Sequence, residues 1–107
     1  MHSEAHNKDA GLGPVLLDIG GDVGALIVAM PAGLAAAEIE IRPMGTSHSH
    51  LDHVGVVDRP VNGRTNYTAV FGALTQGRYE LYQRPDGPVR LLVEIDGGRV
   101  AHATWPA

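Results

Sequence analysis

The stretch Leu74–Tyr82, L-T-Q-G-R-Y-E-L-Y, does most to decide the fold of this chain. It places a leucine, the glycine Gly77 and the tyrosine Tyr79 in the pattern L-x-x-G-x-Y-x-L. Glycine suits a turn because it adopts positive φ without steric cost, and aromatic residues favour the half-buried surface of a strand. The stretch therefore predicts a turn that leads directly into a β-strand.

Short apolar segments on both sides of this stretch are also typical of strands. Polar and apolar residues alternate strictly in Glu38–Arg42, which predicts a strand with its isoleucines in the core and its charged residues, Glu40 among them, in water. Asn62-Gly63 predicts one hairpin, and Asp96-Gly97-Gly98 predicts another between the last two strands. One helical turn at most is expected at Leu34–Ala37. The remaining expected strands are Val15–Ile19, Gly24–Met30, His53–Asp58, Thr65–Phe71, Glu80–Tyr82, Val89–Ile95 and Arg99–Trp105.

About eight strands at a spacing of eight to twelve residues predict an all-β fold, a single Greek-key β-sandwich of seven or eight short antiparallel strands. The 14 glycines and 7 prolines fit the many chain reversals that such a fold needs. A length of 107 residues is that of one domain. We expect it to occupy residues 14–107, after a polar N-terminal tail, residues 1–13, that shows no apolar periodicity.

The L-x-x-G-x-Y-x-L segment resembles the turn and strand of prealbumin-like and carboxypeptidase-regulatory-like sandwiches. In those folds a tyrosine at the start of a strand ties the preceding loop. This resemblance covers Glu38–Trp105 and implies a fold rather than a function. The chain also resembles a family of short actinobacterial proteins that open with L-L-D-I-G-G, here Leu16–Gly21, and close near A-T-W-P, here Ala103–Pro106. Such proteins are sometimes labelled phospholipases, but this chain lacks the G-x-S-x-G motif.

Composition and charge argue against several classes of function. The net charge is −4 and Lys8 is the one lysine, so no basic cluster is present to bind nucleic acid or an anionic membrane. The absence of cysteine excludes disulfides and thiolate chemistry. The apolar run Ala25–Met30 is too short to span a bilayer, and the polar N-terminus does not resemble a signal peptide. A cytoplasmic location is therefore expected.

Three of the six histidines lie within Thr46–Asp58, T-S-H-S-H-L-D-H-V-G-V-V-D. On one strand face His48 and His50 would lie roughly 6.5–7 Å apart at Cα, which lets two imidazoles reach one ion. His53 joins them only if the chain bends just before it. Asp52 is then an oxygen ligand, or an acceptor that fixes an imidazole tautomer. The spacing predicts a site for copper, nickel or zinc, with no organic cofactor, formed by His48, His50, His53 and Asp52.

Further histidines are available to such a site. His102 lies on the last expected strand, and His2 and His6 lie in the N-terminal tail. The alternative interpretation of the histidine-rich stretch is a polar loop whose imidazoles are solvated and titrate near neutrality.

The sequence leaves three classes of function open. The first is a metal-binding protein, although a blue-copper site is excluded because there is no cysteine. The second is a protein-interaction or oligomerisation module, expected as a homo-oligomer, in which Tyr82 and Trp105 are the aromatic residues to examine. The third is a metal-assisted hydrolase, in which an open coordination position activates water. Catalysis ranks lowest, because the serines Ser47 and Ser49 flank His48 and would point away from it on a strand.

Overall fold

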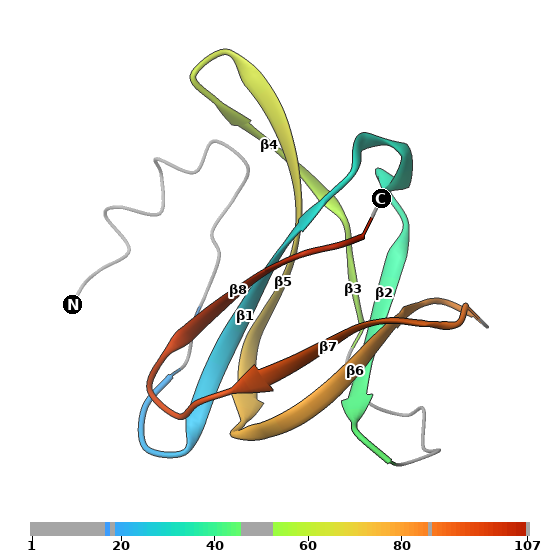
Figure 1. Ribbon diagram of the computed structural model, residues 1–107. Helices are drawn as coiled ribbons and strands as arrows, with labels where there is room; N and C mark the ends of the chain where they lie inside the picture. Colours follow the sequence, from blue (N-terminus) through green and yellow to red (C-terminus); the bar gives the residue numbers. More distant parts are fainter. Residues whose placement is uncertain (1–16, 18, 46–52, 86, 107) are drawn as a thin grey trace.

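A computed structural model describes residues 17, 19–45, 53–85 and 87–106 of the chain. In this part of the chain eight strands form two four-stranded sheets, which confirms the predicted all-β sandwich (Figure 1). The expected tail, residues 1–13, lies outside the described residues. The elements are β1 (Val23–Met30), the short 3-10 turn η2 (Ala32–Leu34), β2 (Glu38–Pro43), β3 (His53–Gly55), β4 (Val57–Val61), β5 (Arg64–Thr75), β6 (Gly77–Gln83), β7 (Val89–Ile95) and β8 (Val100–Thr104).

The strand order is β4-β5-β1-β8 in the first sheet and β3-β2-β6-β7 in the second. The predicted strand His53–Asp58 is divided between the two sheets, because the chain crosses from β3 to β4 at Val56. This residue is buried, and its amide donates a hydrogen bond of 2.8 Å to the Ala37 carbonyl. After Val56 the chain continues as β4 in the first sheet, and β3 is a short edge strand beside β2.

The predicted hairpin at Asp96-Gly97-Gly98 is wrong, because β7 and β8 belong to different sheets. After this turn the chain crosses to the first sheet, where β8 pairs in parallel with β1. The Ala25 amide donates to the Arg99 carbonyl over 3.0 Å, which aligns the start of β8 with β1. Gly24 allows this approach, since a Cβ there would overlap the backbone of the crossing turn. The other strand pairs are antiparallel.

The alternating pattern of Glu38–Arg42 predicted the buried isoleucines of β2 correctly. Ile39 and Ile41 of β2 are almost completely buried, as are Ala69 and Phe71 of β5. The buried core draws on both sheets and consists of Leu26, Val28, Met30, Ile39, Ile41, Val56, Ala69, Phe71, Leu74, Leu81, Ile95 and Trp105. The expected strand Val15–Ile19 is not seen at its described residues, since Leu17 and Ile19 are exposed and lie outside strands.

Local turn chemistry also behaves as predicted. Asn62 and Gly63 both adopt positive φ, 53° and 79°, and join β4 to β5 as a tight hairpin. The Tyr79 hydroxyl donates a hydrogen bond of 2.5 Å to the Thr75 carbonyl, so the tyrosine ties the turn between β5 and β6. This contact is of the kind that the resemblance of the L-x-x-G-x-Y-x-L segment to prealbumin-like sandwiches implies.

Candidate functional site

The histidine-rich stretch ends at the edge of the second sheet. His53 is the first residue of β3, and its backbone lies directly opposite Glu40 of β2. The other predicted ligands, His48, His50 and Asp52, lie outside the described residues. Of the four predicted ligands, the structure therefore places only the backbone of His53, at the edge strand beside β2.

Glu40 is a residue of this region that sequence reasoning missed. The prediction that it faces water is wrong: it is 4% exposed and is the buried charged residue among those described. β2 is a central strand, and Glu40 has the bulky Tyr82 of β6 as its register partner on the side away from His53. A central position between such neighbours removes a side chain from water even on the face that alternation assigns to solvent.

The two carboxylate oxygens of Glu40 have different surroundings. Oε1 lies 3.3 Å from Nε of Arg84. Oε2 is buried and has no hydrogen-bond partner among the described residues. An unsatisfied buried acceptor on a charged group costs roughly 1–3 kcal/mol or more, so Oε2 is a position at which a donor or a cation would be stabilised.

Other charged side chains near Glu40 lie on β2, on β6 and directly after β6. Arg84 also contacts Glu38, with 3.1 Å between Nη1 and Oε1. Arg42 pairs with Glu80 at 2.7 Å and lies over the Tyr82 ring, 4.9 Å from its centroid. In these contacts the carboxylates of Glu38 and Glu40 share the Arg84 guanidinium, and Glu80 pairs with Arg42.

Tyr82 is held in its neutral form by this environment. Burial raises the pKa of the Tyr82 hydroxyl, and the Glu40 carboxylate raises it further as a hydrogen-bond acceptor and a negative charge. The Glu80 carboxylate raises the pKa of Arg42. Tyr82 and Trp105 are 5% and 3% exposed, so neither belongs to an exposed aromatic patch of the kind the interaction hypothesis considered.

His102 lies in a different part of the fold from β3. It is exposed on β8, at one edge of the first sheet. The opposite edge of that sheet is β4, which follows β3 in the chain after one residue, with β5 and β1 between β4 and β8 (Figure 1). The structure therefore does not bring His102 to the start of β3.

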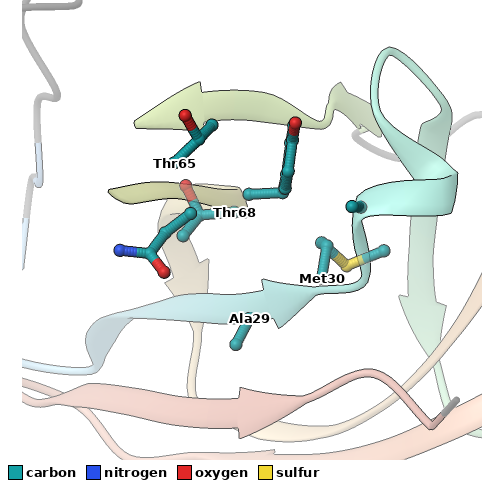
Figure 2. A pocket seen from close by; sticks show the side chains of 7 residues that line it. Ala29, Met30, Thr65 and Thr68 are labelled. Atoms are coloured by element: carbon teal, nitrogen blue, oxygen red, sulfur yellow. The ribbon is translucent and has the colours of Figure 1, made fainter. Parts of the chain in front are cut away.

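A separate open pocket of about 430 Å³ lies where β1 ends against β5 (Figure 2). Met30 is the last β1 residue in the ladder, paired with Tyr67, so residues 64–66 of β5 pair with β4 alone. Thr68 Oγ1 is buried there without a hydrogen-bond partner among the described residues. The lining has no charged side chain or histidine and consists of Ala29, Met30, Ala32, Thr65, Asn66, Tyr67 and Thr68.

Comparison with known proteins does not assign this chain to a family. No protein-family model matches the sequence, and a search of curated proteins found no match. Within the described ranges no three His, Cys, Asp or Glu residues gather closely enough to hold a metal ion. Among the same residues no helix has the length and hydropathy needed to cross a membrane.

Proposed function

We propose that this chain is a metal-binding protein that holds Cu(II), Ni(II) or Zn(II) through His48, His50, His53 and Asp52. The observation that supports this most is the pairing of His53 with Glu40 in the β2–β3 ladder. It sets the backbone at the end of the histidine-rich stretch opposite a buried carboxylate, one oxygen of which has no partner among the described residues. A carboxylate near this point attracts a cation and favours its binding to neutral imidazoles.

The length of the chain limits how far apart the ligands can lie. His50 precedes His53 by three residues, so their Cα atoms are at most about 11 Å apart even in a fully extended chain. Each imidazole reaches several ångströms from its own Cα, so the two rings can meet at one ion. The expected setting of this function is the cytoplasm, and the expected assembly is a homo-oligomer.

Metal content and metal affinity test the proposal directly. The protein is purified without a tag or chelator, its metal is determined by elemental analysis, and Cu(II), Ni(II) and Zn(II) are titrated calorimetrically. We expect one equivalent of metal in the wild type and its loss in the double variant His48→Ala/His50→Ala. His102→Ala is the matched control, since it removes an exposed histidine at the far edge of the first sheet and should bind normally. Failure of the wild type to bind, or equal binding by the double variant, would refute the proposal.

The same site would become catalytic if one coordination position stayed open to water. Metal-assisted hydrolysis would then appear as metal-dependent cleavage of an activated ester or phosphoester. This activity would be absent from His48→Ala/His50→Ala and retained in His102→Ala. Metal binding without any such hydrolysis would support the metal-binding function and exclude the hydrolase.

A second candidate function is self-association through β7. This strand lies at the edge of the second sheet, and it carries Leu92 and Val89, which are 58% and 39% exposed. An edge strand with exposed aliphatic side chains is suited to pairing with a second chain. Light scattering after gel filtration, with and without chelator, tests this: a metal-independent dimer that Leu92→Glu dissociates would support it, and a monomeric wild type would exclude it.

A further inference from the structure

The two sides of the sandwich at which the sheets end are built differently. On one side the chain passes from β3 of the second sheet to β4 of the first through the single residue Val56. On the other side β7 and β8 lie beside each other as edge strands, and among the described residues each pairs with one neighbour (Figure 1). An edge strand presents backbone N–H and C=O groups that a further strand can pair with. The side formed by β7 and β8 is therefore the one suited to strand addition.

Of these two edges, β7 is the one with large apolar side chains in water. Leu92 is 58% exposed, more than any other large apolar residue in the described part of the chain, and Val89 is also exposed. The described exposed residues of this kind include none from β8. The apolar edge is therefore β7.

The charges of β7 are arranged symmetrically about Leu92. This residue is the midpoint of the seven-residue strand Val89–Ile95, and the exposed Arg90 and Glu94 lie two positions to either side. In an antiparallel pair of two copies centred on Leu92, each Arg90 lies opposite the Glu94 of the other copy. Opposed side chains lie about 4.5–5.5 Å apart at Cβ, where opposite charges stabilise the pair and like charges destabilise it.

Other registers of the same pairing match less well. A two-fold axis that keeps inner face beside inner face passes between two copies of the same residue, because a shift by one residue would turn the faces over. An axis at Arg90 or Glu94 sets like charges opposite each other. An axis at Leu91 or Val93 sets Leu92 opposite a charged residue. The axis at Leu92 pairs apolar with apolar and each charge with its opposite.

Arg90 lies at an irregular point of β7. The register with β6 shifts between Leu81 and Tyr82, which leaves Arg90 as the extra residue of a bulge, and its guanidinium donates to the Pro106 carbonyl over 3.3 Å. A guanidinium has five N–H donors, so this contact leaves donors for a carboxylate of a second copy. The ladder between copies would be regular over residues 91–93, with an ion pair just beyond each end.

We infer that two copies of this chain pair antiparallel through β7, with the two-fold axis at Leu92 and an ion pair between Arg90 of each copy and Glu94 of the other. The second sheets of the two copies then form one continuous sheet of eight strands. The inference rests on self-association through β7, the second candidate function, and adds the register and the residues that select a second copy as the partner. It does not depend on a metal site.

Single cysteines test the register, because the chain has no cysteine of its own. In Leu92→Cys the two Cα atoms would lie about 4.5–5.5 Å apart, within the range of a disulfide. Glu94→Cys is the matched control, since its two copies would lie four residues out of register, on the order of 14 Å apart. With oxidised glutathione we expect Leu92→Cys to form a covalent dimer on a non-reducing gel and Glu94→Cys to stay monomeric there. Equal crosslinking by both variants, or crosslinking by neither when the wild type is a dimer, would overturn the inference.

Charge reversal tests the two ion pairs by sedimentation at low ionic strength. Arg90→Glu and Glu94→Arg each set like charges opposite at both ends of the ladder, so each should raise the Kd of the dimer at least about tenfold. The double variant Arg90→Glu/Glu94→Arg restores opposite charges and should recover most of the affinity. Arg64→Glu, an exposed residue at the start of β5, changes the net charge equally and should leave the Kd unchanged. Single reversals no stronger than Arg64→Glu, or no recovery in the double variant, would overturn the inference, provided that circular dichroism shows each variant folded.

The outcomes separate this inference from the candidate function beneath it. If the wild type is a monomer, self-association and the inference both fail. If the wild type is a dimer that Leu92→Glu dissociates but the cysteine and charge variants do not follow the register, the inference alone fails.

Discussion

Replacing Arg84 with methionine removes the guanidinium partner of the buried Glu40 carboxylate. Methionine keeps most of the aliphatic length of arginine, so the change mainly removes donors and charge. Nε of Arg84 lies 3.3 Å from Glu40 Oε1, and Oε2 already has no partner among the described residues. In Arg84→Met the carboxylate therefore loses its nearest positive charge in a place that water does not reach.

The expected loss of stability follows from the exposure of the two side chains. Breaking a buried ion pair by removing one partner costs about 3–5 kcal/mol, whereas an exposed pair contributes at most about 1 kcal/mol. Glu40 is 5% exposed and Arg84 is 39% exposed, so the pair lies between these limits. We expect Arg84→Met to lower the free energy of unfolding by about 2–3 kcal/mol. In a domain of this size that corresponds to a fall in Tm of roughly 10 °C or more.

Urea unfolding followed by circular dichroism at neutral pH measures this loss. Arg84 also contacts Glu38 at 3.1 Å, and Glu38→Gln weakens that exposed contact, so we expect it to cost less than about 0.5 kcal/mol. The double variant Glu40→Gln/Arg84→Met replaces the unpaired Glu40 carboxylate with a neutral amide. It should recover at least half of the free energy of unfolding that Arg84→Met loses. If Arg84→Met is as stable as Glu38→Gln, the buried Glu40 carboxylate does not need Arg84 as its partner.

Three further predictions concern single positions. Tyr79→Phe removes the hydroxyl that ties the β5–β6 turn and should cost about 1 kcal/mol in urea unfolding; no loss would show that the turn needs no tie. Gly24→Ala places a Cβ against backbone carbonyls and should cost more than about 2 kcal/mol, whereas Gly33→Ala, with open space around the new methyl, should be nearly neutral in the same assay. The pKa of Tyr82 is raised above 10.0 in the folded state, so its contribution to stability is complete below pH 10 and is lost as the pH rises through the folded pKa. Stability measured between pH 9 and 11 should therefore fall more steeply in the wild type than in Tyr82→Phe, and parallel curves would contradict this.

Features set by a few neighbouring residues were predictable from the sequence. The alternation in β2 placed Ile39 and Ile41 in the core, because side chains project to opposite faces with a period of two. The hairpin at Asn62-Gly63 followed from residues that tolerate positive φ. The hydrogen bond from the Tyr79 hydroxyl joins residues four positions apart. Its donor Tyr79 and its acceptor Thr75 therefore both lie within the stretch Leu74–Tyr82.

The candidate site was predictable only in part. Histidine and aspartate at short spacing are metal ligands by their chemistry, so His48, His50, His53 and Asp52 can be named from the sequence, and their binding of metal stays a prediction. Glu40 could not be named in this way, because on the strand alone it is one of several charged residues in an alternating pattern. Its burial depends on Tyr82 and Arg84, which are more than forty residues away in the chain.

The sequence by itself determined most of the strands of this protein, the buried isoleucines of β2 and the tight hairpin at Asn62-Gly63. These depend on backbone conformation and side-chain period, which act over a few residues. Only the tertiary structure decided that the chain changes sheets at Val56, that β8 pairs in parallel with β1, and that Glu40 is buried. Each of these depends on which distant strands become neighbours in a sheet, because strand pairing and the exclusion of water are properties of the packed sheets and not of any one segment.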